Sequence, residues 1–348
     1  MPHFVTLGMF IIDEFSIITA TGTSRTLAPQ IGGGGTYAAI GARIWLPPSQ
    51  IGMIIDRGSD FPPSFESKLA EFGSEMWTYR NQPGGTTRAL NTYQGDQRSF
   101  DYITPRIRIT PQDLQGTRLE NAKTLHFICS PSRASVIMSQ AREILDWNPI
   151  VIYEPIPDRC VPEELGPLVK VLPQIDILRC ANFRFYQIIF AQISRSPNAE
   201  EALSLLSLPL PPTLELIEEA ARRFLEFGVG VDRQGCVIIR SGAMGACVAM
   251  KNQPVRWVPA FWTRKDQAKI VDVTGAGNSF LGGLAAGLLL EGGDIYKATF
   301  HASVSASFVI EQEGLPTMSN VNESTQWNGD TPQRRLVDLK KRQVEPED

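Results

Sequence analysis

Short apolar runs alternate along this chain with helix-length amphipathic stretches, and this alternation limits the folds open to it. The apolar runs fall at residues 5–12, 51–55, 124–128, 150–153, 175–178 and 237–239. The amphipathic stretches occupy 65–72, 134–146, 163–172 and 214–227. Strands that are apolar on both faces are normally buried between two layers of helices. The pattern therefore predicts an α/β fold with a mostly parallel sheet.

Two segments interrupt the alternation. Residues 76–79 and 86–93 have a polar, period-2 pattern, and a Pro-Gly-Gly turn lies between them. Such segments typically form half-exposed antiparallel strands, so we expect a small second sheet attached to the main one. Residues 317–348 are polar, and we expect them to form a loosely attached tail with a short helix near 334–342.

Length and charge exclude several classes of protein. The chain has 348 residues, which allows one large α/β domain or two smaller ones. Its net charge is -4 and it has no run of five or more Lys and Arg, which argues against a nucleic-acid partner. The longest apolar stretch, 280–290, is shorter than the about 20 residues of a membrane span. Residues 1–13 lack the pattern of a signal peptide, so we expect a cytoplasmic protein with no membrane partner.

The cysteines and histidines do not form a metal-binding pattern. The five cysteines are odd in number and widely spaced, without a Cys-x-x-Cys pair, as expected for buried free thiols in a reducing compartment. With only three histidines, no zinc site is predicted. His126 falls in a predicted buried strand, and we expect it to be a hydrogen-bonded core residue.

The sharpest motif is Asp272-Val-Thr-Gly-Ala-Gly-Asn278, followed by an apolar helix. We expect a strand at 269–271, then a loop of small residues, then the helix. The first turn of a helix has unpaired backbone N–H groups, so Gly275, Ala276 and Gly277 can form a hole for a phosphate or an oxyanion. A tight strand-to-helix turn in which Asn278 is only a cap remains open as the alternative.

A dinucleotide-binding domain is a rival interpretation of this loop. Gly275 and Gly277 supply the first two glycines of that fingerprint, but Phe280 stands at the third position. Too little chain follows the loop to complete a dinucleotide domain.

The loop resembles the C-terminal signature Asp-Thr-x-Gly-Ala-Gly-Asp of the PfkB, or ribokinase-like, carbohydrate kinases. Further segments are similar to that family in order and spacing, at 8–13, 32–39, 58–60, 95–98 and 242–245. The resemblance implies a ribokinase-like three-layer α/β/α sandwich with a small β-lid. It also implies one domain over 1–316, with lid pieces at about 13–31 and 76–105, followed by a polar tail over 317–348.

The resemblance further implies transfer of the γ-phosphate of ATP, usually with Mg²⁺, to a sugar, polyol or nucleoside. The residues that would bind the acceptor are Asp13, Gly32, Gly33, Tyr37 and Arg98. Those on the nucleotide side would be Asn182, Gly242, Gly245 and Ser303. Asp272 and Thr274 match the positions that hold a monovalent cation such as K⁺ in some members. Dimers formed through the lid are common in the family, so a homodimer is expected.

Two departures from the family pattern affect the reaction. The last residue of the signature is Asn278, where the family has the Asp that acts as general base. Phe185 replaces the Glu of an Asn-x-x-Glu motif that begins at Asn182 and helps to organise Mg²⁺ and phosphate. These changes suggest a divergent, fungal-type member whose phosphoryl transfer is weak or lost. The alternative is an inactive pseudokinase that acts as a ligand-binding or protein-assembly factor.

Overall fold

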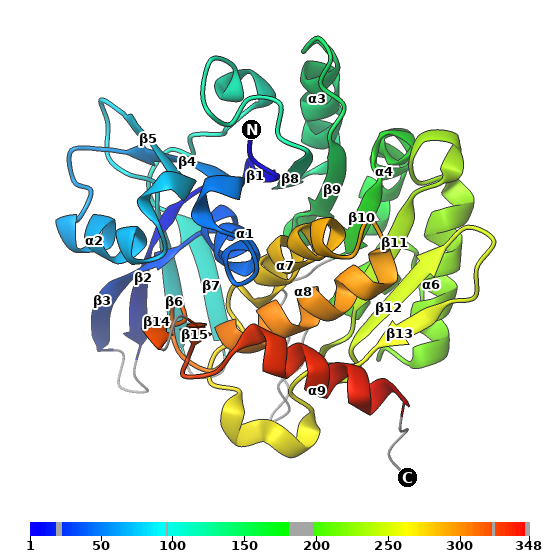
Figure 1. Ribbon diagram of the computed structural model, residues 1–348. Helices are drawn as coiled ribbons and strands as arrows, with labels where there is room; N and C mark the ends of the chain where they lie inside the picture. Colours follow the sequence, from blue (N-terminus) through cyan, green and yellow to red (C-terminus); the bar gives the residue numbers. More distant parts are fainter. Residues whose placement is uncertain (19–22, 95–96, 181–197, 322–323, 345–348) are drawn as a thin grey trace.

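The computed structural model describes residues 1–18, 23–94, 97–180, 198–321 and 324–344 (Figure 1). Within these residues, nine strands form the central sheet, in the order β13-β12-β11-β10-β9-β8-β1-β4-β5. From the β5 edge, their bounds are β5 Trp77–Asn81, β4 Ile51–Arg57, β1 Phe4–Thr6, β8 Thr124–Cys129, β9 Ile150–Pro155, β10 Ile177–Cys180, β11 Cys236–Arg240, β12 Ala246–Met250 and β13 Arg256–Val258. The pairs from β5 to β11 are parallel, and β12 and β13 are antiparallel.

Helices cover both faces of this sheet, so the predicted α/β/α arrangement is confirmed (Figure 1). One face carries α1 Gly34–Arg43, α7 Ala276–Leu290 and α8 Ile295–Val309. The other carries α3 Pro131–Arg142, α4 Leu165–Val171, α5 Asn198–Leu205 and α6 Leu214–Phe227. Side chains alternate between the two cores along each strand because successive residues of a strand point to opposite faces.

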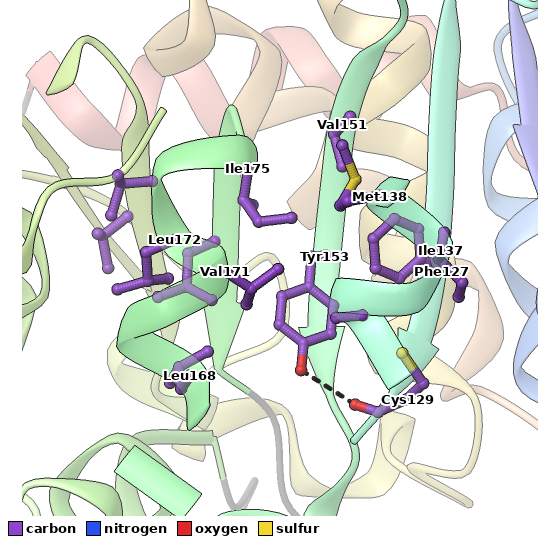
Figure 2. Close-up of a cluster of buried hydrophobic side chains, with 14 of the residues drawn as sticks. Phe127, Cys129, Ile137, Met138, Val151, Tyr153, Leu168, Val171, Leu172 and Ile175 are labelled. Carbon is purple, nitrogen blue, oxygen red and sulfur yellow. Dashed lines mark hydrogen bonds between the residues drawn. The ribbon is translucent and has the colours of Figure 1, made fainter. Parts of the chain in front are cut away.

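Figure 2 shows the core between the sheet and helices α3 and α4, where side chains connect the carboxyl ends of β8 and β9. Phe127 on β8 and Tyr153 on β9 lie side by side, with ring centroids 5.3 Å apart. The Tyr153 hydroxyl donates a hydrogen bond of 3.1 Å to the carbonyl of Cys129, the last residue of β8. The polar tip of a buried tyrosine thus ties two neighbouring strands at their carboxyl ends, where ligands bind in open α/β sheets.

The single strand predicted for 5–12 is two strands. β1 ends at Thr6, and β2 Ile11–Ile18 belongs to a separate four-stranded sheet. Between them Gly8 lies against α1, where a Cβ atom would come within 2.6 Å of Gly35 Cα. The Gly8 N–H donates to Thr6 Oγ1 at 3.0 Å. This close turn takes the chain out of the main sheet.

The second sheet has the order β3-β2-β6-β7, with β3 Ser24–Gly32, β6 Arg88–Gln94 and β7 Gln97–Tyr102. The prediction that 76–79 belongs to a small antiparallel sheet is wrong. Met76 ends the short 3₁₀ helix η2, Ser74–Met76, and residues 77–79 belong to β5, which pairs in parallel with β4 at the edge of the main sheet. The side chain of Trp77 is buried there, against α2 Pro63–Glu71, and its indole N–H donates to the Leu69 carbonyl at 2.8 Å.

The expectation of a loosely attached tail at 317–348 is also wrong. β14 Met318–Val321 and β15 Ser324–Trp327 form a hairpin, and α9 Pro332–Val344 packs along α8. Trp327 is fully buried and stacks on Phe72, with ring centroids 5.8 Å apart. Arg335 is buried above the Phe308 ring and pairs with Glu311 at 2.7 Å. Most of the segment is polar because one face of a short hairpin and a surface helix meets solvent.

Candidate active site

The loop before α7, which we predicted to be an anion hole, is an N-terminal turn without a capping side chain, and no strand leads into it. The chain instead forms the short 3₁₀ helix η9, Arg264–Lys269, and then an extended loop whose Val271 N–H donates to the Ile310 carbonyl at 2.8 Å. Gly275 is the N-cap of α7, in the left-handed region with φ 77°, and it has no side chain to cap the helix. The first helical turn therefore has no capping side chain, although the Ala276 N–H donates to the Val273 carbonyl at 3.2 Å.

Tyr37 on α1 supports this loop. Its side chain is only 4% exposed, and a Cβ atom at Gly275 would overlap its ring. The ring therefore lies directly against the Gly275 backbone. Both the positive φ and this close approach require glycine at position 275.

Asn278 is the third residue of α7, and its amide points across the site toward α1. A Cβ atom at Gly34 would lie 3.0 Å from Asn278 Oδ1 and 2.6 Å from Ile128 Cδ1. Asn278 Oδ1 is buried, and it has no hydrogen-bond partner among the described residues. The group at the base position is thus an amide held between the first turns of two helices.

Of the predicted acceptor residues, Asp13, Gly32 and Gly33 lie together at the start of α1. The Asp13 carboxylate lies over Gly32, where any Cβ atom would overlap it, and Asn91 on β6 donates to Asp13 Oδ1 at 3.4 Å. Gly33 has φ 94° and is packed against the backbone of Met9. Arg98 lies on β7, but its side chain is outside the described residues.

The predicted nucleotide side is less complete. Gly242, with φ 58°, begins the short turn between β11 and β12, and Gly245, with φ 91°, ends it. The Ser241 N–H closes this turn on the Gly245 carbonyl at 2.7 Å. Ser303 is buried on α8. Asn182, together with Phe185, lies outside the described residues.

The predicted monovalent-cation residues lie at the entrance to the loop. Asp272 Oδ1 accepts the Thr274 N–H at 2.9 Å, which brings the carboxylate against the turn. Among the described residues, no group of three or more His, Cys, Asp or Glu side chains is arranged to hold a metal ion.

A buried cluster of charged residues, which the sequence did not predict, lies beside Gly277. Glu154, Arg179 and Arg240 stand at or near the carboxyl ends of the adjacent strands β9, β10 and β11, and Glu201 reaches them from α5. Arg179 is fully buried and pairs with Glu154. A Cβ atom at Gly277 would lie 2.5 Å from Arg240 Nη2 and 2.7 Å from Arg179 Nη2.

Burial dominates the protonation of this cluster. Loss of hydration raises the pKa of Glu154, even though the charge of Arg179 opposes the shift. It raises the pKa of Glu201 well above its ordinary value and lowers that of Arg240 well below it. The signal in the sequence is that each of three strands carries a charged residue, Glu154, Arg179 or Arg240, at a position where a buried strand normally has an apolar one.

Comparisons with known proteins match one family model and two relatives of similar length. Residues 195–321 match the family model for pfkB family carbohydrate kinases. The chain is 34% identical to the uncharacterized protein C16C9.01c of Schizosaccharomyces pombe, over 96% of this chain and 91% of that protein. It is 32% identical to Protein MAK32 of Saccharomyces cerevisiae, over 95% of this chain and 90% of that protein.

Solved structures share the fold at low sequence identity. Phosphofructokinase-2 from Escherichia coli, in complex with substrates and products, aligns with a TM-score of 0.64 and 13% identity over 98% of this chain and all of that one. Ribokinase from Thermotoga maritima aligns with a TM-score of 0.62 and 18% identity, again over 98% of this chain and all of that one. No helix within the described residues is long and apolar enough to span a bilayer.

Proposed function

Because this chain belongs to the pfkB family of carbohydrate kinases, we propose that it binds ATP and a small alcohol but transfers phosphate slowly or not at all. The observation that carries this proposal is the Asn278 amide in the first turn of α7, between the anion-hole glycines and Gly34. The alcohol would be a sugar, a polyol or a nucleoside, bound beside Asp13 and Gly32.

An amide cannot replace a carboxylate as a base. Asn278 can orient an acceptor hydroxyl by hydrogen bonding, but it cannot accept the proton that this hydroxyl loses. A positioned base contributes about 10² to 10⁴ in rate. Phosphoryl transfer otherwise depends mainly on positioning and charge stabilisation, so the expected deficit is of this size. Asp13 or a water molecule would then receive the proton.

The surroundings of Gly277 support binding of the phosphates. The N-terminus of α7 favours negative charge, and the guanidinium groups of Arg179 and Arg240 both approach Gly277. Each guanidinium also lies near the Phe280 ring, 5.8 Å from its centroid for Arg179 and 5.6 Å for Arg240. Two guanidinium groups thus lie beside Gly277, where the family binds the transferred phosphate, although the carboxylates of Glu154 and Glu201 belong to the same cluster.

The oxygen ligands that the site offers determine which metal ions it could hold. A K⁺ ion needs oxygen ligands, and the second carboxylate oxygen of Asp272 with the Thr274 hydroxyl would supply two. Mg²⁺ prefers carboxylates, phosphates and water. Glu154, a buried carboxylate of the cluster beside Gly277, is already paired with Arg179. A Mg²⁺ ion would therefore be held chiefly by the phosphates of ATP.

The second candidate is a pseudokinase that acts as a ligand-binding or assembly factor. The observation in its favour is the pairing of Glu154 with Arg179, since a site that balances its own charges can persist without a ligand. A homodimer through the lid stays a prediction, and exposed Leu27 on β3 is in keeping with it.

Two measurements on wild type and Asn278→Asp test the proposal. The first is ATP-dependent phosphorylation of a panel of sugars, polyols and nucleosides, in which Asn278→Asp should be faster by about 10² or more. The second is thermal unfolding with ATP, where a ligand at 100 times its dissociation constant adds about 2.7 kcal/mol. Wild-type turnover at the rate of Asn278→Asp would disprove the role given to the amide. No shift in melting temperature at millimolar ATP would disprove nucleotide binding.

A further inference from the structure

Two guanidinium groups reach the first turn of α7 from the carboxyl ends of neighbouring strands. Arg179 on β10 lies opposite Ile238 on β11, and Arg240 is two residues further along β11. Because residues two apart on a strand project from the same face of a sheet, Arg179 and Arg240 share one face. A Cβ atom at Gly277 would lie within 2.7 Å of an Nη2 atom of each. The glycine therefore leaves both cations beside the backbone of the turn that begins α7.

Both guanidinium groups are fixed by contacts with the protein. Arg179 is fully buried and pairs with Glu154 on β9. The Phe280 ring, one turn along α7 from Gly277, lies near both guanidinium groups, at centroid distances of 5.8 Å for Arg179 and 5.6 Å for Arg240. A guanidinium held in this way loses little freedom when it binds a ligand, so it presents its N–H donors in a defined geometry.

The energetics of the cluster favour the arrival of an anion. Burial lowers the pKa of Arg240 well below its ordinary value, and the charge of Arg179 lowers it further, against the opposing effect of the two glutamates. Burial raises the pKa of Glu201 well above its ordinary value, and the charge of Glu154 adds to this shift. Loss of hydration and a like charge thus both destabilise the guanidinium of Arg240, which stays protonated. An anion beside Gly277 would relieve this destabilisation.

The same groups do not fit a divalent cation. Mg²⁺ binds oxygen atoms of carboxylates, carbonyls, phosphates and water, whereas a guanidinium has no acceptor atom. The carboxylate of Glu154 is already engaged by Arg179. In the sequence, Phe185 stands where the family has the Glu that helps to organise Mg²⁺. Around Gly277, the described residues thus offer nitrogen donors where a Mg²⁺ ion would need oxygen.

We propose that Arg179 and Arg240 take the place of a divalent cation at this site, so that the chain binds the phosphates of ATP without Mg²⁺. This inference rests on the proposed function, which puts those phosphates at the α7 loop. A guanidinium offers two parallel N–H donors that match two phosphate oxygens. Arginine, lysine and Mg²⁺ are alternative means of stabilising phosphate charge. Two guanidinium groups in place leave a metal ion little to add, so Mg²⁺ should not strengthen the binding of ATP.

Calorimetric titration of the full chain with ATP tests this proposal, once in EDTA and once with excess Mg²⁺ at equal ionic strength. The dissociation constant in EDTA should be equal to that in Mg²⁺ or lower. A site that needs the metal would instead bind ATP less tightly in EDTA by about tenfold or more. ATP binding that requires Mg²⁺ overturns this inference and leaves the proposed function standing. No binding of ATP in either solution overturns both.

Variants show which residues replace the metal. Arg240→Met should weaken the binding of ATP in EDTA by about tenfold or more, with a smaller loss in Mg²⁺ because the metal then supplies the missing charge. The double variant Glu154→Gln with Arg179→Met removes both partners of the buried pair and should act in the same direction. Arg240→Lys keeps the charge and should fall between wild type and Arg240→Met. The matched control is Arg142→Gln, which changes an exposed arginine at the end of α3.

The quantity compared is the ratio of the dissociation constants in EDTA and in Mg²⁺, which a general loss of stability would not change. Replacing a buried charged pair by residues of lower polarity often leaves stability unchanged, and urea unfolding checks that each variant is folded. A ratio that stays at the wild-type value in both Arg240→Met and the double variant would overturn the role given to the two arginines.

Discussion

Replacing His126 with glutamine should remove much of the acid sensitivity of the folded state. His126 lies on β8 and is fully buried. Its Nδ1 is 2.9 Å from Thr6 Oγ1, and its Nε2 has no hydrogen-bond partner among the described residues. Burial, aided by the positive charge of Arg179, lowers the pKa of His126 from 6.5 to about 3.

The direction and size of the effect follow from linkage. The unfolded chain takes up a proton at this residue near pH 6.5, whereas the folded chain does so only near pH 3. The neutral imidazole therefore contributes its full stability above pH 6.5, and that contribution is lost progressively as the pH falls toward 3. Between about pH 7.5 and about pH 4.5 the free energy of unfolding should fall by about 2.7 kcal/mol through His126 alone.

Urea unfolding of the wild type and His126→Gln at these two pH values measures this contribution. The substitution also disturbs the core, so the quantity compared is the change in unfolding free energy between the two pH values. Burial also lowers the pKa values of His3 and His301, and both remain in the variant. The variant should therefore retain part of the acid sensitivity. An equal loss on acidification in both proteins would refute the reasoning.

Three further predictions concern the core and the anion hole. Trp327→Ala should lower the free energy of unfolding, measured in urea, by about 3–5 kcal/mol. The control Val337→Ala, at a 51% exposed site on α9, should change this free energy little. Equally small effects of both variants would mean that the hairpin is loosely attached. Glu154→Gln should cost about 3–5 kcal/mol because the buried Arg179 loses the carboxylate with which it pairs, and the double change with Arg179→Met should recover much of this loss. A double variant as unstable as the single one would contradict the pairing. Gly275→Ala places a Cβ atom at a residue with φ 77° and against the Tyr37 ring. This variant should lose the ATP-induced rise in melting temperature. A rise equal to that of the wild type would argue against an anion hole in this loop.

The sequence predicted the parts of the fold that are determined by residues close together in the chain, such as helix caps and apolar periodicity. The helix expected at 214–227 is α6 at those residues, because Thr213 caps its start and Gly228, with φ 94°, ends it. The resemblance to the ribokinase-like family and the α/β/α sandwich it implied are confirmed. The position of Asn278 at the start of α7 also follows from its local sequence, because small residues precede an apolar helix.

Features that depend on distant partners could not be predicted in this way. The period-2 pattern at 76–79 does not indicate that β5 pairs with β4 of the main sheet. No strand precedes the anion hole because Val271 bonds to the end of α8, about 40 residues later in the chain. The Glu154–Arg179 pair is recognisable only when the strand order is known, since each residue alone breaks an apolar strand.

The stack of Trp327 on Phe72 also has a consequence for the order of events during synthesis. These two rings belong to one core, yet they are more than 250 residues apart in the chain. A ribosome releases Phe72 long before it makes the residue that covers it. Until residues 318–344 emerge, the apolar surface that they bury stays open to water or to a chaperone. Closing such distant contacts is slow, so this half of the molecule should be the last to gain protection from proteolysis on a translating ribosome.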